Sequence, residues 1–305
     1  MTTATNGIAP VPQLGVIRVE GEDAAKFLHG QLTQDFALLG LSEARLAALC
    51  SPKGRVLASF VGFKRSHTEI LLLCQRDILP AMVKRLSMFV LRAKARITDA
   101  SDAYVLCGLL GSAVAQVAGS TGAPWTRVDV GPASILFLYP ADAVDRALWL
   151  APADTPLPPT PDLPSVAWLH AEVRSGIASI GTAMSDAFVP QMLNYESVGA
   201  VNFKKGCYPG QEVVARSQFR GTLKRRAVLG HSEVALQPGD ELFLDTEPDQ
   251  PGATVVQVAA APGGGFDAIL SGQISAFQAK ELHQGAADGP RVTVQPMPYP
   301  LLEDI

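Results

Sequence analysis

Residues 201–226 read VNFKKGCYPGQEVVARSQFRGTLKRR, and this stretch divides the chain into two parts with different patterns. Before it, segments with strand and helix periodicity are mixed, which favours an α+β body over a doubly wound parallel sheet. After about residue 222, short β segments alternate with Pro-Gly, Gly-Gly-Gly and Asp-rich turns, a pattern typical of a small β-barrel or sandwich. The stretch itself predicts a tight turn with glycines on both sides of Cys207, followed by a helix over 211–216.

The same stretch is strongly basic. It contains seven lysines and arginines but only one acidic residue, Glu212, in a chain whose formal net charge is −4. Such a cluster attracts anions locally. A protein that coats nucleic acid over its whole surface is normally basic throughout, so any anion site here must be local. The simpler alternative is a solvated basic face.

Length and composition exclude several classes of protein. The chain has 305 residues, which at ~150 residues per domain suggests two domains or three small ones. Hydrophobic residues make up 48% and charged residues 18%, which excludes a disordered chain, a collagen, a coiled coil and a small disulfide scaffold.

Periodicity and turn residues predict the organisation of the chain. Between 152 and 164 there are six prolines, which predict a stiff, extended linker. We expect a discontinuous α+β unit over 1–110 plus 165–221, a smaller α/β segment with the proline-rich linker over 111–164, and a C-terminal β-barrel over 222–305. Strands are predicted at 14–19, 44–50, 55–63, 68–74, 94–98, 103–110 and 134–139, and helices within 20–36, at 77–90, after 112, at 141–149 and from Ser165 to about Arg174.

The four cysteines fall into two groups. Cys50, Cys74 and Cys107 lie in apolar stretches and are expected to be small core residues, which suits a reducing compartment. Cys207 is flanked by lysines, glycines and the start of a helix, an environment in which a thiol ionises more readily and becomes more reactive. An inert buried thiol is the alternative. No histidine is near it in sequence, so a Cys–His couple cannot be inferred.

Several other features are absent from the sequence. The N-terminal residues resemble neither a secretory signal nor a presequence, so a cytoplasmic location is expected. The uncharged stretch 103–126 contains four glycines and predicts a buried strand, a turn and a helix, with no membrane span. No metal-ligand spacing occurs, so no metal site is predicted.

Several segments of the chain resemble a known family. The motif KGCYPGQE (205–212) followed by RGTLKRR (220–226) resembles the YgfZ-type folate-binding proteins, which are relatives of the glycine-cleavage T-protein. Further resembling segments follow in the family's order: FLHGQLTQD (27–35), LCSPKGRVLASF (49–60), FVLRAKARI (89–97) and FVPQMLNYESVGAVNF (188–203).

The resemblance implies a T-protein-like fold, with ferredoxin-like α+β domains in a ring-like arrangement and a C-terminal β-barrel. It implies that tetrahydrofolate or a derivative binds near the central hole. It also implies an accessory role in the assembly or repair of iron–sulfur clusters, in support of cluster-dependent enzymes such as those that thiolate tRNA, with Cys207 as the functional thiol. Iron–sulfur enzymes or cluster carriers are the expected partners.

The chain departs from the T-protein at positions that matter for catalysis. An acidic residue that orients folate in an aminomethyltransferase is matched here by Ala58 and Ser59, and a glutamate that anchors the pterin is matched by Arg174. Without these carboxylates, acid–base assistance of C–N cleavage has no obvious agent. We therefore do not expect a classical aminomethyltransferase, although a folate-dependent one-carbon transferase remains the alternative.

Candidate folate-binding residues come from the segments that carry the resemblance. Arginine and lysine suit the carboxylates of the folate tail, although the simpler reading of each is a solvated surface cation. Direct RNA binding is a third hypothesis, but the basic segment lacks an RNP-type aromatic signature, so it is not expected. The candidates are the cations Lys53, Arg55, Arg92, Arg174 and Lys205, together with the motif residues Tyr208, Gln211 and Glu212.

Overall fold

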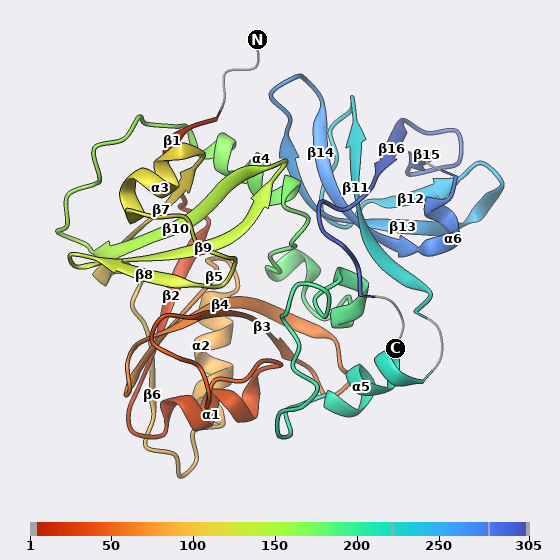
Figure 1. Cartoon of the computed structure of the whole chain (residues 1–305). Coiled ribbons are helices and arrows are strands. Elements are labelled where there is room, and N and C mark those ends of the chain that lie inside the picture. Colours follow the sequence, from red (N-terminus) through yellow and green to blue (C-terminus); the bar gives the residue numbers. More distant parts are fainter. Residues whose placement is uncertain (1–4, 221–222, 280, 303–305) are drawn as a thin grey trace.

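The computed structural model describes residues 5–220, 223–279 and 281–302. Its first unit is an antiparallel sheet in the order β3-β4-β5-β2-β6, with two helices packed on one face (Figure 1). Leu79, Met82 and Leu86 recur at helical spacing and are buried in this core. The elements are β2 (Leu14–Glu20), α1 (Ala24–Gln31), β3 (Ala44–Cys50), β4 (Val56–Ser66), β5 (Glu69–Gln75), α2 (Leu79–Met88) and β6 (Arg96–Asp99).

The second unit is another five-stranded antiparallel sheet, in the order β1-β7-β10-β9-β8. It joins strands from both sides of residue 110, because β7 pairs with β10 along its full length. Its elements are β1 (Gly7–Pro10), the 3-10 turn η1 (Ser101–Ala103), β7 (Tyr104–Leu110), α3 (Ser112–Ala118), β8 (Arg127–Val130), β9 (Ala133–Ala141) and β10 (Val144–Pro152).

The two sheets share a core, since Phe63 and Leu71 of the first sheet pack with Leu136 and Leu148 of the second. Helix α4 (Ser165–Arg174) lies against the second sheet and the barrel. Its Trp168 is fully buried and lies so close to β7 that a Cβ on Gly108 would overlap the indole ring. A residue without a side chain is therefore required at 108 for α4 to approach the sheet.

The third unit is a closed six-stranded barrel in the order β11-β14-β13-β12-β15-β16, seen at the right of Figure 1. Its interior is filled by aliphatic side chains. The elements are β11 (Arg225–Ser232), β12 (Glu241–Leu244), β13 (Glu247–Ala260), β14 (Phe266–Gln273), α6 (Ile274–Phe277), β15 (Glu281–Gln284) and β16 (Arg291–Gln295).

A central segment over 175–220 connects the three units. It contains η2 (Thr182–Met184), η3 (Pro190–Leu193) and α5 (Gln211–Phe219), and its apolar residues share one core with strands of the first sheet and the barrel. After β16 the chain returns to this segment. The Tyr299 hydroxyl donates to the Gly176 carbonyl over 2.8 Å, and the Leu302 N–H donates to Ser197 Oγ over 3.0 Å.

One predicted element is wrong. Residues 141–149 were expected to form a helix, but 144–152 form strand β10 at the centre of the second sheet. Both faces of a central strand are covered, so residues 146–151 are all buried. A continuous apolar run of this kind cannot be distinguished from a buried helix by periodicity alone. The short edge strand β8 was not predicted.

Candidate functional site

The motif loop, residues 205–210 directly before α5, is held by two turns that pack against each other. Gly210 has φ of 77°, and a Cβ there would clash with the Ser51 carbonyl oxygen. In the opposite turn Gly54 has φ of 71°, and its Cβ would lie 2.7 Å from the Cβ of Val213. Glycine supplies both the left-handed backbone and the close approach. The turn over 52–54 therefore packs directly against the start of α5.

Lys205 fastens the loop to helix α1. Its side chain is buried, and its ammonium donates to the carbonyl oxygens of His29 and Leu32, over 2.9 Å in the second case. It also lies 4.7 Å from the centre of the Tyr208 ring, a cation–π contact. Burial lowers the pKa of Lys205 to about 8. In this structure the ammonium is thus engaged by backbone oxygens and the buried ring of Tyr208.

Cys207 is exposed on this loop, whereas the other three cysteines are buried. Burial raises the pKa of Cys50 and of Cys74 to about 12 and that of Cys107 to about 11. These three side chains belong to the apolar cores, as their flanking residues predicted. Cys207 is therefore the cysteine that a reagent or partner can reach in the folded chain.

A histidine that is distant from the motif in sequence lies beside it in the structure. His29 is on α1, and a Cβ on Gly206 would lie 3.3 Å from its Nε2. Its Nδ1 is 3.0 Å from Asp35 Oδ1. Although burial opposes it, hydrogen bonds from the Leu38 N–H and from His29 lower the pKa of Asp35. Asp35 therefore orients the His29 imidazole, and this imidazole lies next to Gly206, the residue before Cys207.

The remaining motif candidates surround the loop. Lys53, in the turn over 52–54, and Arg55, directly after it, are exposed, and Arg55 donates to the Ala187 carbonyl. At the start of α5, the Gln211 N–H donates to the Tyr208 carbonyl, and the exposed Glu212 pairs with Arg216 over 2.7 Å. The structure thus places these candidates at the start of α5 and in the chain segment that packs against it.

Arg92 lies elsewhere. It is exposed in the connection between α2 and β6, which is at the bottom of Figure 1, apart from α5.

A separate cavity lies between the two sheets, α4 and the segment after it. Its walls include Trp125 and Tyr139, whose ring centres are 5.8 Å apart, and Ser59 of β4. Its free space is about 60 Å³, which is room for a few water molecules. A flat ring of pterin size would therefore require lining side chains to move.

This cavity contains a buried carboxylate that was not predicted from the sequence. Glu172 lines it and accepts a hydrogen bond from Gln13 Nε2 over 3.1 Å. Burial raises the pKa of Glu172, against the attraction of Arg146, which also lines the cavity and lies over the Trp168 ring. The signal was available, because Glu172 is four residues after Trp168 and shares its helix face. Glu172 is therefore an acidic group in this cavity at a position other than those matched to the T-protein carboxylates.

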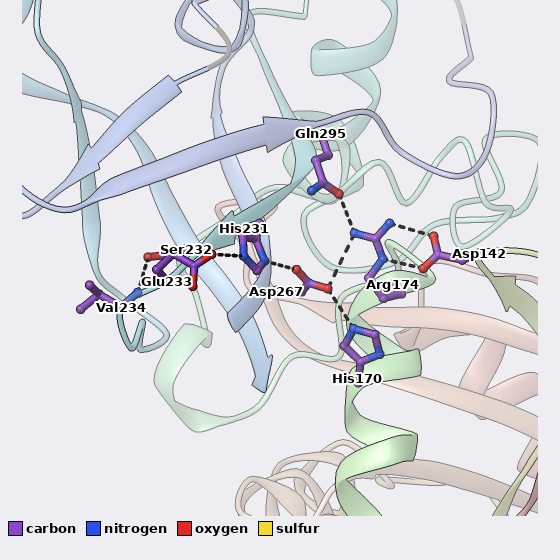
Figure 2. Close-up of polar contacts among 9 residues, drawn as sticks. All are labelled: Asp142, His170, Arg174, His231, Ser232, Glu233, Val234, Asp267 and Gln295. Carbon is purple, nitrogen blue, oxygen red and sulfur yellow. Dashed lines mark hydrogen bonds and ion pairs between the residues drawn. The ribbon is translucent and has the colours of Figure 1, made fainter. Parts of the chain in front are cut away.

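Arg174, two residues further along α4, is part of a polar network outside this cavity (Figure 2). Its Nε and Nη2 donate to Asp142 over 2.7 and 2.8 Å, and its Nη1 donates to Gln295 of the barrel over 2.6 Å. The network continues through Asp267, which lies 2.8 Å from both His170 Nε2 and His231 Nδ1. Arg174 thus connects α4 to the second sheet and the barrel.

The most informative relatives by sequence are curated bacterial proteins. The tRNA-modifying protein YgfZ of Edwardsiella ictaluri (strain 93-146) is 31% identical over 303 residues, which cover 93% of this chain and 89% of that protein. The chain belongs to the YgfZ family. The YgfZ protein of Enterobacter sp. (strain 638) is 28% identical over 299 residues, which cover 93% of this chain and 90% of that one. No protein-family model matches the chain.

The T-protein-like fold of this YgfZ-family chain is confirmed by a solved structure. The aminomethyltransferase T of the glycine cleavage system from Bartonella henselae superposes with a TM-score of 0.71, covering 97% of this chain and 87% of that one at 16% identity. The predicted α+β class with a C-terminal barrel is correct.

Two further observations concern the described part of the chain. No helix within 5–220, 223–279 or 281–302 is long and apolar enough to cross a membrane. Among the same residues, no cluster of three or more histidine, cysteine or acidic side chains is arranged to hold a metal ion.

Cys207 should be alkylated by iodoacetamide at least about a hundredfold faster than the other cysteines at pH 7.5, because buried thiols with raised pKa values supply little thiolate. Peptide-resolved mass spectrometry measures the four rates. Cys207→Ser serves as the control, since it should leave no fast-reacting thiol until denaturant is added. Equal rates at all four positions would contradict the assignment.

The network around Asp267 should make stability depend on pH. The hydrogen bond with Asp267 raises the pKa of His231 above 6.5, so the folded state favours the protonated imidazole. Its contribution is fully present below the unfolded pKa and is lost as the pH rises through the folded value. His231→Gln should therefore destabilise the protein more at pH 5.5 than at pH 8.5 in urea unfolding. The exposed His67→Gln is the control, and a loss independent of pH would refute this account.

Proposed function

We propose that this chain is a folate-binding accessory protein in the assembly or repair of iron–sulfur clusters, which supports cluster-dependent enzymes such as those that thiolate tRNA. Cys207 is its working thiol. The observation that carries the proposal is the exposure of this one cysteine on a loop fastened at Gly54, Gly210 and Lys205. The name of its relatives, tRNA-modifying proteins, supports a role connected with tRNA modification.

The exposed thiol suits the transfer of an iron–sulfur cluster to a partner protein rather than the storage of a cluster in this chain. A thiolate is the form that acts as a nucleophile or a soft metal ligand. One cysteine cannot hold an iron–sulfur cluster alone, so the remaining ligands come from the client enzyme or cluster carrier. The exposed loop lets such a partner approach Cys207 without unfolding the chain.

The cavity lined by Trp125, Tyr139 and Glu172, which we call the central cavity, is the proposed folate site. Trp125 and Tyr139 offer aromatic walls for the flat pterin, and the Glu172 carboxylate can accept hydrogen bonds from its N–H groups. Burial disfavours the charged form of Glu172, and a ligand that pairs with the carboxylate would offset this free-energy cost. When bound, a tetrahydrofolate would supply one-carbon chemistry, while these residues hold and orient its ring.

One observation favours the alternative of a folate-dependent aminomethyl or one-carbon transferase. Glu172 provides a carboxyl group in the cavity, and a carboxyl group with a raised pKa can donate a proton. Against this, Ser59 lines the cavity at the position matched to the T-protein acid, and its Oγ accepts from the Ile180 N–H over 2.8 Å. Formation of formaldehyde that depends on added tetrahydrofolate would support this alternative.

A reduced folate should stabilise the folded protein by mass action. At a concentration of about 100 Kd the stabilisation is about 2.7 kcal/mol, visible as a rise in Tm. Glu172→Gln should reduce the rise, because the ring N–H groups lose an ionised acceptor. Each protein is compared with its own ligand-free Tm, and exposed Glu247→Gln serves as the control. The absence of any shift at millimolar tetrahydrofolate would remove the folate claim.

Cys207→Ala should leave the fold and the folate-dependent Tm shift intact, because the side chain is exposed and outside the cavity. It should nevertheless abolish rescue of a bacterial strain that lacks its YgfZ protein, with tRNA thiolation as the readout. Cys107→Ala, which removes a buried thiol, is the matched control and should rescue. Full rescue by Cys207→Ala would show that the thiol is not the working group.

A further inference from the structure

A second pocket lies at the C-terminal end of α5, away from the central cavity. It is enclosed by η3, the end of α5, the start of β11 and Gln273 at the end of β14, and its volume is about 370 Å³. This volume falls within the roughly 300–1,000 Å³ of small-molecule sites. None of its lining residues lines the central cavity.

Three cations surround this pocket. Arg220, Lys224 and Arg225 line it, and none of them forms an ion pair with a carboxylate among residues 5–220, 223–279 and 281–302. Two other cations of the basic stretch differ, since Arg216 pairs with Glu212 and Arg226 pairs with the buried Glu196. Unpaired arginine and lysine around a concave site suit an anion with more than one negative charge.

The pocket also has an apolar wall. Val189, Met192 and Leu223 line it beside the cations. A phosphate or sulfate ion alone would leave this wall in contact with water. A ligand that joins a flat, partly apolar group to its anionic end would cover both parts of the lining.

Gln191 adds a buried hydrogen-bond acceptor. It lines the pocket and is 0% exposed. Its Nε2 donates to the Val214 carbonyl over 2.8 Å, which fixes the orientation of the amide, since a flipped amide would set two oxygens against each other. Its Oε1 has no hydrogen-bond partner among the described residues. A buried acceptor without a partner is costly, and a donor on a bound ligand would satisfy it.

We propose that this pocket binds a nucleoside phosphate. The phosphate would contact Arg220, Lys224 and Arg225, the base would lie against the apolar wall, and an N–H of the base would donate to Gln191 Oε1. A γ-linked glutamate chain shares the negative charge and the N–H donors, but it has no ring to cover the wall. The observations therefore favour the nucleotide.

The test measures binding of AMP to the full chain by titration calorimetry in metal-free buffer at fixed salt. AMP should bind at least about tenfold more tightly than inorganic phosphate or ribose 5-phosphate, because only AMP carries the base. Arg220→Gln combined with Lys224→Gln should weaken AMP binding at least about tenfold through the lost charge-assisted contacts. The double variant Lys84→Gln with Lys204→Gln removes the same charge from exposed positions outside the pocket and should change binding less than about twofold.

Four results would overturn the proposal. These are no AMP binding at about 10 mM, phosphate binding as tight as AMP binding, equal weakening by the two double variants, and tighter binding of a γ-linked glutamate tetramer. Circular dichroism and the Tm of each variant establish that it is folded. Because the pocket shares no residue with the folate cavity or with Cys207, failure here leaves the folate and thiol proposals standing, and their failure leaves this one standing.

Discussion

The approach of Trp168 to the bare backbone of Gly108 sets the position of helix α4, and much of the structure depends on that position. Because no side chain separates the indole from β7, the helix lies low on the second sheet and contacts the barrel on its other side. One turn after Trp168 it places Glu172 in the central cavity, and at its end it places Arg174 against Asp142 and the barrel. A single close contact thus positions the central cavity and the contact between the units.

The motif loop is positioned by a different kind of constraint. Its glycines and Lys205 contribute shape and hydrogen bonds to backbone oxygens, and Cys207 is the exposed residue that they hold in place. A thiol on such a loop keeps its direction while remaining open to large partners. Rigid backbone beneath an exposed reactive group is the arrangement expected of a site that works on another macromolecule.

Much of the fold followed from local patterns, because the strands over 44–75 are separated by short turns and the helices at 79–88 and 165–174 bury clear apolar faces. Strand β10 was missed because its burial on both faces removes the alternation that marks a strand. The exposure of Cys207 was predictable from its polar, glycine-rich neighbours. The positions of Glu172 and His29 were not predicted, because the direction of a helical side chain depends on how the helix packs, and His29 reaches Gly206 only through tertiary contacts.

The return of the chain after β16 has a mechanical consequence. The barrel is tied to the central segment at its entrance, where β11 follows α5, and again at its exit, where Tyr299 and Leu302 bond to Gly176 and Ser197. A body held at two separate points can rotate only about the line that joins them, as long as both attachments hold. A rearrangement between the barrel and the central segment is therefore restricted to that axis or to sliding of the packed surfaces.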